Sequence, residues 1–322
     1  MRNDEQPQPD RGRLLGDLAA AIGAKSRAFL ERLPTAELLY LSWRKDLQQR
    51  YADPARGVFV LQWEMSAVAR GEAALAEIES CASVNWSDAW SLDVGCGDGG
   101  FVVAMARRGA RSHGVDLSVG NIAGANLRAR AWQTTVAFAA GSAASLPYRS
   151  GSFDVVTCGD VIEHVAQPDA CLREIERVLR PRGILWLAAP TRYLPANLWR
   201  DPHYHYFGVS ALPRRIAAWY LVRLRHALPA LNAYAVERLP KYGATVAALR
   251  RMGFEMLAGE YRPLAALRDP ERVQIRWKKR LLTALLAAGL RAPLRFTYSI
   301  AAELAWPLRV ACRKPGPVTR KP

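Results

Sequence analysis

The sequence predicts an α/β fold in which a mostly parallel sheet carries helices on both faces. Short apolar segments alternate with helical segments between residues 88 and 190, at the spacing of strand–helix–strand units. A glycine-rich turn joins the first of these strands to the helix that follows it. Half of the 322 residues are hydrophobic, which is enough for a full core. Because crossover helices cover both faces of a parallel sheet, its strands are expected to be apolar throughout.

The first predicted region, residues 1–87, is an N-terminal arm followed by a helical cap. Residues 1–12 are polar and contain prolines, which favours a loose arm. From Leu14 to about Glu79 the apolar residues recur at helical spacing. We therefore expect several helices before the sheet begins.

The predicted core, residues 88–190, holds five strands separated by helices. The strands are expected at 90–94, 112–116, 136–139, 153–158 and 183–189, and two of the helices at 101–108 and 170–179.

A long insertion follows the core. Residues 191–241 are rich in Trp, Tyr, His, Arg and Pro, and we expect them to form a lid over the carboxyl edge of the sheet, where open α/β folds bind ligands. Residues 242–275 resume the alternation, with a helix at 244–252 and a strand at 254–260, and end the sheet. Residues 276–322 are expected to form a basic amphipathic tail outside it.

The turn after the first strand has the features of a site for an adenosine-containing cofactor. Its glycines let the backbone turn sharply and approach a ligand, and the following helix offers free N–H groups. Asp116 lies nineteen residues beyond Gly97, at the end of the next strand, where a carboxylate can accept ribose hydroxyls. The spacing alone does not select the cofactor, because Gly95, Gly97 and Gly100 also satisfy the GxGxxG pattern of dinucleotide dehydrogenases.

The segments around this turn point to one cofactor. They follow one another as Leu92–Gly99 (LDVGCGDG), Gly114–Ser118 (GVDLS), Leu146–Val156, Asp160–Val165 (DVIEHV) and Val178–Leu185. Together they resemble a class I S-adenosylmethionine-dependent methyltransferase, and they are most similar to the group that includes the quinone-biosynthesis O-methyltransferases. The resemblance covers about residues 88–190. It implies a Rossmann-like sheet of seven strands and S-adenosylmethionine as the cofactor.

The resemblance also implies which residues contact the cofactor. Asp93 and the loop Gly95–Gly99 hold the methionine part, Asp116 holds the ribose hydroxyls, and Asp160 faces the cofactor or the acceptor. Where the family commonly carries an acidic residue near the adenine, this chain has Ser142, whose hydroxyl bonds the exocyclic amine without charge assistance. The implied cofactor residues are Asp93, Gly95, Cys96, Gly97, Gly99, Asp116, Leu117, Ser142, Ala143 and Asp160.

Three histidines are the candidate catalytic residues. Transfer to a hydroxyl requires removal of its proton, and a positioned base contributes about 10²–10⁴-fold to such a step. His164 follows the fourth strand and is the first candidate, with a structural role in its turn as the alternative. His203 and His205 lie in the insertion, where they serve a catalytic lid or, alternatively, pack in a small aromatic core. We expect no metal, because hard cations prefer carboxylates and two histidines at i, i+2 are weak support.

The net charge of +16 is confined to the C-terminal part of the chain. Residues 1–199 hold 22 basic and 22 acidic residues, whereas residues 200–322 hold 23 and 7. Basic helices expected near 214–225 and 276–295 combine arginines with Trp and Leu, a composition typical of helices that lie on an anionic membrane surface. The alternative is that their apolar stripes pack on the domain. Nucleic acid is not an expected partner, because no RNA-binding signature is present.

The sequence thus predicts a methyltransferase that uses S-adenosylmethionine on a small-molecule or lipid-linked acceptor. O-methylation of a quinone precursor or a lipid-borne glycan is the leading hypothesis. The alternatives are an NAD(P)-dependent oxidoreductase that shares the glycine turn and an inactive membrane adaptor with a methyltransferase-like fold. A charged start without signal-peptide features, no long apolar run and five Cys without a CxxC pair indicate a cytoplasmic protein, peripheral on the inner face of the membrane if the basic segments bind lipid.

Overall fold

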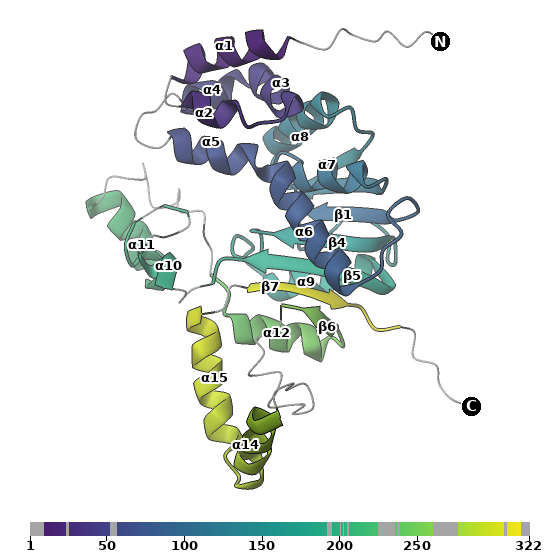
Figure 1. Cartoon of the computed structure of the whole chain (residues 1–322), viewed down its shortest axis with the longest axis vertical. Coiled ribbons are helices and arrows are strands. Elements are labelled where there is room, and N and C mark those ends of the chain that lie inside the picture. The colour runs from purple at the N-terminus through teal and green to yellow at the C-terminus, as the bar shows by residue number, and fades with distance from the viewer. Residues whose placement is uncertain are drawn as a thin grey trace. The chain divides into compact units, whose positions relative to one another are not determined.

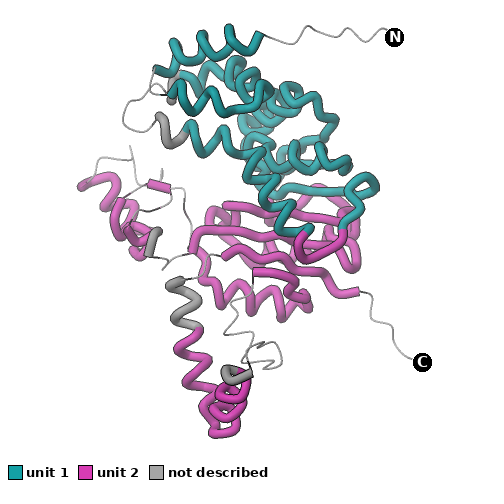
Figure 2. Tube along the Cα trace, in the orientation of Figure 1, with its two compact units in different colours: residues 1–79, 84–142 teal, residues 80–83, 143–322 magenta. Residues whose placement is uncertain are grey.

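The structure, a computed structural model, shows two compact units (Figure 1). Figure 2 shows unit 1, residues 1–79 and 84–142, and unit 2, residues 80–83 and 143–322. The units cut across the five predicted regions, because the cap and the first three strands share unit 1. The residues that the structure describes are 10–23, 26–51, 57–191, 195–199, 201, 203–204, 206–224, 236, 239–259, 276–305 and 308–316.

Helices form the N-terminal part of unit 1, as the sequence predicts. Helices α1 to α5 enclose an apolar core of their own, in which Leu30, Leu38 and Leu61 are fully buried. α6 is longer and leads to the first strand. The helices are α1 (Arg11–Ile22), α2 (Arg27–Leu30), α3 (Thr35–Trp43), α4 (Lys45–Tyr51), α5 (Gly57–Met65) and α6 (Ala67–Cys81).

Seven strands form one sheet in the order β3-β2-β1-β4-β5-β7-β6. β1, β2 and β3 pair in parallel, as do β4 and β5, whereas β7 is antiparallel to both β5 and β6. The predicted seven-stranded, mostly parallel sheet is therefore confirmed. The strands are β1 (Trp90–Val94), β2 (Arg111–Asp116), β3 (Ala137–Ala140), β4 (Phe153–Gly159), β5 (Leu179–Ala189), β6 (Glu255–Ala258) and β7 (Leu308–Arg313).

The helices between the strands have the expected positions. α7 (Gly100–Arg107) and α8 (Val119–Ala131) belong to unit 1, and α9 (Pro168–Val178) and α12 (Tyr242–Arg251) belong to unit 2. α9 illustrates why these segments are helical. Pro168 occupies its first turn, where no backbone donor is lost, and its buried residues recur at helical spacing.

The insertion after β5 contains short helices around a small core. They are α10 (Pro195–Trp199), the 3₁₀ helix η2 (Val209–Ala211), α11 (Arg214–Trp219) and the π-helix η3 (Tyr220–Leu224). Val209, Ala217 and Leu221 are fully buried in this core, and Tyr204 and Tyr206 pack against it. The aromatic residues of the insertion thus help to close a core, which was one of the two predicted roles.

Two helices precede the last strand. They are α14 (Arg276–Ala287) and α15 (Arg291–Ala305), and α15 contacts α12. Both are basic and helical, as predicted. Among the described residues, no helix combines the length and apolarity that crossing a bilayer requires.

The prediction that everything after residue 275 lies outside the sheet is wrong. β7 pairs with β5 from Ala189 to Ile184 and with β6 on its other side. Its burial is nearly continuous, because a strand inside a sheet covered by helices has no solvent face. The sequence prediction placed Leu308–Arg313 in the basic tail and so missed the change from helical to extended structure there.

Candidate active site

The glycine-rich loop between β1 and α7 is held in a tight turn by β2. The backbone N–H groups of Gly95 and Cys96 both donate to the carbonyl of Val115, at 2.7 and 2.9 Å. Gly95, Gly97 and Gly99 have φ of 71°, 51° and 84°, a left-handed region that is costly for residues with a side chain. The predicted sharp turn is confirmed.

Two glycines of this loop have different surroundings. A Cβ atom at Gly97 would meet no atom within 4 Å, so the main chain there faces open space. A Cβ atom at Gly99 would lie 3.0 Å from both Ala125 Cβ and Phe138 Cζ. A ligand can therefore approach the backbone at Gly97, while Gly99 lets the loop pack closely on α8 and β3.

Asp116, at the end of β2, organises the loop. Its Oδ2 accepts a hydrogen bond from the Gly97 N–H at 2.9 Å. Its Oδ1 accepts from the Ser118 N–H at 2.8 Å and from Asn121 Nδ2 at 3.1 Å. A carboxylate has about four acceptor positions, so one is left for a ribose hydroxyl. The contact between Asp116 and the ribose stays a prediction. Asp116 also has a structural role, because it holds the glycine loop.

Carboxylates give the loop a negative potential. Burial raises the pKa of the Cys96 thiol, and the nearby charges of Asp93, Asp116 and Asp98 raise it further. The thiol is therefore neutral and is not a nucleophile. The same negative charges attract a cationic ligand and repel phosphate groups.

Arg128 of α8 compensates one of these charges from inside the fold. Its side chain is fully buried and forms an ion pair with Asp98 and another with Glu37 of α3, the latter at 3.2 Å from Nε to Oε1. It also donates to the carbonyl oxygens of Asp98 at 3.1 Å and of Glu64 at 3.0 Å. Burial lowers the pKa of Arg128, but Asp98 and Glu37 outweigh it and raise the pKa overall, so the guanidinium stays charged. The cap helices α3 and α5 are thereby tied to the glycine loop.

Tyr40 of α3 extends this network. Its hydroxyl donates to Asp98 Oδ2 at 2.9 Å and accepts from Arg44 Nη1 at 2.7 Å. Burial, and next the charge of Asp98, raises the pKa of Tyr40, so the hydroxyl remains a donor. Sequence reasoning missed Tyr40, Glu37 and Arg128, because none of them belongs to a local motif.

Apolar side chains are exposed immediately after Asp116. Leu117 is 79% exposed and Val119 is 70% exposed. Aliphatic surface beside a ligand-binding loop suits the flat face of an adenine, which favours the role predicted for Leu117. Ser142 is also exposed, and Ala143 is half-buried as the first residue of the second segment of unit 2.

The remaining predicted residues lie in unit 2. Asp160 follows β4 with φ of 57°, an uncommon conformation for a residue other than glycine. Its N–H donates to the carbonyl of Ala188 at 2.9 Å, which anchors the turn to β5. Strained residues that the surrounding structure holds in place collect at functional sites, so this geometry favours a role for Asp160.

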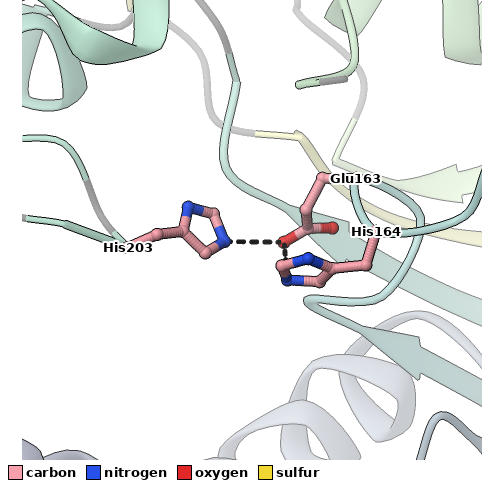
Figure 3. A group of neighbouring side chains, drawn as sticks. All are labelled: Glu163, His164 and His203. Atoms are coloured by element: carbon pink, nitrogen blue, oxygen red, sulfur yellow. Dashed lines mark ion pairs between the residues drawn. The ribbon is translucent and has the colours of Figure 1, made fainter. Parts of the chain in front are cut away.

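The structure brings two of the three candidate histidines together. Figure 3 shows His164 and His203 next to the carboxylate of Glu163, and their Nε2 atoms lie 3.9 and 3.7 Å from its Oε1. Glu163 belongs to the DVIEHV motif, but no sequence pattern marked it as a site residue. His205 lies outside the described residues.

Comparisons with known proteins match the predicted core of the chain to one family. Residues 92–187 match the family described as a methyltransferase domain. The ubiquinone biosynthesis O-methyltransferase of Xanthomonas oryzae pv. oryzae is 33% identical over 142 residues, which cover 40% of this chain and 59% of the relative. The protein of that name from Methylococcus capsulatus is 37% identical over 109 residues, 34% of this chain and 46% of the relative. The chain thus spans about half the length of these curated relatives.

Among solved structures, an S-adenosylmethionine-dependent methyltransferase from Mesorhizobium loti is 20% identical, with a TM-score of 0.46 over 75% of this chain and 96% of that one. The [4+2]-cyclase SpnF is 21% identical, with a TM-score of 0.47 over 77% of this chain and 82% of that one.

The chain therefore contains a methyltransferase domain of the class I S-adenosylmethionine-dependent family. S-adenosylmethionine is the cofactor of this domain, as the sequence predicts.

Asp116→Asn should weaken cofactor binding at least about tenfold, because an amide keeps the shape but loses the charge and replaces one acceptor with a donor. Calorimetric titration with S-adenosylmethionine measures the effect. Asp154→Asn, which removes a carboxylate paired with Arg180 in unit 2, is the control and should leave affinity unchanged. Equal affinity of all three proteins would contradict the assignment of Asp116.

Tyr40→Phe should raise the dissociation constant for the cofactor several-fold, because Asp98 loses a donor and the glycine loop loses its link to α3. The free energy of unfolding should fall by about 1–3 kcal/mol for the same reason. Tyr242→Phe is the matched control, because it removes a buried hydroxyl that donates to the Gly259 carbonyl in unit 2. Tyr242→Phe should lower the free energy of unfolding and leave the affinity for the cofactor unchanged. If both variants lose cofactor affinity to the same extent, the role of Tyr40 is purely structural.

Proposed function

We propose that this chain transfers a methyl group from S-adenosylmethionine to an oxygen atom of a lipophilic or lipid-linked acceptor, such as a quinone precursor or a lipid-borne glycan. The match of residues 92–187 to methyltransferase domains carries the proposal. The names of the relatives from Xanthomonas and Methylococcus support an oxygen acceptor of the quinone type.

In this proposal the cofactor lies along the glycine loop. The loop and Asp93 hold its methionine part, and the carboxylates around Cys96 complement its sulfonium and ammonium charges. Asp116 binds the ribose with its remaining acceptor position, and Leu117, Ser142 and Ala143 surround the adenine. A dinucleotide would instead bring a pyrophosphate to the same carboxylates, which disfavours the oxidoreductase alternative.

The reaction itself is an in-line displacement. The acceptor oxygen forms a bond to the methyl carbon while the carbon–sulfur bond breaks, and the bonding electrons return to sulfur to give S-adenosylhomocysteine. The chain's main task is to place the acceptor on this axis. The hydroxyl proton passes to a base, for which we propose His164, with His203 beside it and Asp160 facing the cofactor or the acceptor. The role of His205 stays a prediction.

The surface of the insertion supports a lipophilic acceptor. Trp199 and Phe207 are 76% and 68% exposed and stack edge-to-face with their ring centres 5.8 Å apart. Ile216, Trp219 and Leu224 are also about half exposed. Single exposed apolar residues are ordinary, but aromatic residues gathered on one small element mark an interaction surface.

Exposed arginines accompany this apolar surface and the two C-terminal helices. Arg215 lies on α11 with Trp219 and Arg223 lies on η3 with Leu224. Arg280, Arg291 and Arg295 lie on α14 and α15 with the exposed Phe296. Each basic residue near an anionic surface contributes about 1 kcal/mol to binding. We therefore propose that the protein acts at an anionic membrane surface, where such an acceptor is concentrated.

The proposed activity is tested by combining the purified chain, isotopically labelled S-adenosylmethionine and a lipid extract. Mass spectrometry should find a lipid-soluble product that has gained one CH₂, together with S-adenosylhomocysteine. Calorimetry should show binding of S-adenosylmethionine and none of NAD. Cofactor binding without any S-adenosylhomocysteine would favour the inactive adaptor, and methylation confined to water-soluble acceptors would contradict the lipophilic acceptor.

Vesicle binding tests the membrane surface. The chain should sediment with phosphatidylglycerol vesicles at low salt, and Trp199→Ser with Trp219→Ser should weaken this binding on the order of tenfold. Trp63→Ser removes a half-exposed Trp from unit 1, where Arg70 stacks on it, and should have no effect. If the double variant binds vesicles as the wild type does, the insertion is not the membrane-binding element.

A further inference from the structure

Glu163 is a buried carboxylate whose oxygens accept no hydrogen bond. Its side chain is 0% exposed, and Oε1 and Oε2 both lack a hydrogen-bond donor. A buried carboxylate that is neither hydrogen-bonded nor closely paired is strongly disfavoured, since it has lost its hydration without replacement. An unsatisfied group of this kind indicates a binding site.

Two imidazole nitrogens face this carboxylate. His203 Nε2 lies 3.7 Å and His164 Nε2 lies 3.9 Å from Glu163 Oε1, and one ligand atom from each residue lies within 4.8 Å of the others (Figure 3). The two rings are nearly perpendicular, at 86°, with their centres 5.0 Å apart. Neither distance is a hydrogen bond, whose N–H···O length is 2.7–3.2 Å.

The fold holds each of the three residues by its backbone. Glu163 and His164 lie in the turn after Asp160, where the His164 N–H donates to the Val161 carbonyl at 2.9 Å. In the insertion, the buried carboxylate of Asp201 accepts hydrogen bonds from the N–H groups of His203 at 2.9 Å and Tyr204 at 2.8 Å. His203 Nδ1 is also buried without a partner, so the main chain, not a side-chain bond, aims this ring.

We propose that Glu163, His164 and His203 bind a divalent transition-metal ion, with Zn²⁺ as the best fit. Two imidazoles and one carboxylate are a ligand set of zinc sites that keep an open coordination position. Zinc–ligand bonds of 2.0–2.2 Å place tetrahedral ligand atoms roughly 3.3–3.5 Å apart. The two nitrogen–oxygen separations, 3.7 and 3.9 Å, exceed this by a few tenths of an ångström, and the three ligand atoms lie within 4.8 Å of one another, so side-chain rotations are needed to complete the site.

The donor types exclude a hard cation as the preferred ligand. Mg²⁺ and Ca²⁺ prefer oxygen donors, and this site offers one carboxylate against two imidazoles. The competing explanation is an ion pair between Glu163 and protonated histidines. It leaves both oxygens of the Glu163 carboxylate without a hydrogen bond at the observed distances, whereas a bound cation would be a direct partner for that carboxylate.

This proposal departs from the expectation that no metal binds, and it goes beyond the proposed function. An imidazole nitrogen bound to the ion has no lone pair left for a proton, so the role of His164 as a base belongs to the metal-free site. The proposal requires neither a particular acceptor nor methyl transfer, because the ligand atoms all belong to unit 2 and the site is defined without the cofactor.

The test is a metal titration of the full chain after chelation and removal of the chelator. Zn²⁺ followed by calorimetry should bind with a stoichiometry of about one, and Co²⁺ should give the visible absorption bands of a low-coordinate site with nitrogen and oxygen ligands. Glu163→Gln and His203→Gln should each weaken binding at least about tenfold and abolish the Co²⁺ bands. His113→Gln, which removes a partly buried imidazole from β2 in unit 1, is the control and should leave both signals unchanged.

Three results would overturn the proposal. They are no saturable Zn²⁺ binding by the wild type, wild-type Zn²⁺ binding in both Glu163→Gln and His203→Gln, and displacement of Zn²⁺ by equimolar Mg²⁺. Circular dichroism establishes whether each variant is folded. If Glu163→Gln does not fold, Zn²⁺ binding by His203→Gln, which changes a residue of the insertion, decides the test. Because neither cofactor nor acceptor is present, failure here is independent of the proposed methyl transfer.

Discussion

The buried guanidinium of Arg128 is the interaction on which unit 1 depends. It meets the carboxylates of Glu37 and Asp98 and the carbonyls of Asp98 and Glu64, and so joins α3, α5, α8 and the glycine loop at one point. Burying such a charge is costly, and removing one partner of a buried ion pair costs more than the pair contributes. The loop is held by β2 and Asp116 on one side and, through Arg128, by the cap helices on the other, so a change in the cap reaches the loop.

This constraint connects the cap to cofactor selection. The glycine geometry by itself suits any ligand that approaches the main chain closely, including a dinucleotide. The charges favour a cationic ligand, because the carboxylates of Asp93, Asp98 and Asp116 lie around Cys96, while Arg128 pairs with Asp98. Glu37 and Tyr40 of the cap contact Arg128 and Asp98, and we therefore expect them to influence cofactor binding without touching the cofactor.

Local patterns predicted the parallel sheet and the glycine turn, because both depend on residues close together in the chain. The pairing of Arg128 with Glu37 joins positions 91 residues apart, and no motif encodes it. The strand Leu308–Arg313 escaped prediction because its pairing with β5 and β6 defines it more than its own short pattern does. Glu163 likewise belongs to a motif that was recognised from the sequence, but its burial next to two histidines depends on the tertiary fold.

The cluster at Glu163 relates the insertion to the sheet of unit 2. The insertion has only a small core around Val209 and Leu221, and small cores contribute little stability. Among the described residues, the pair of His203 with Glu163 links the insertion to the turn after β4. An ion that binds only when His203 is in place stabilises that placement by mass action, by RT ln(1 + [L]/Kd). On this reasoning a bound ion would act first as a positional constraint on the insertion, and an effect on the acceptor would follow from that constraint.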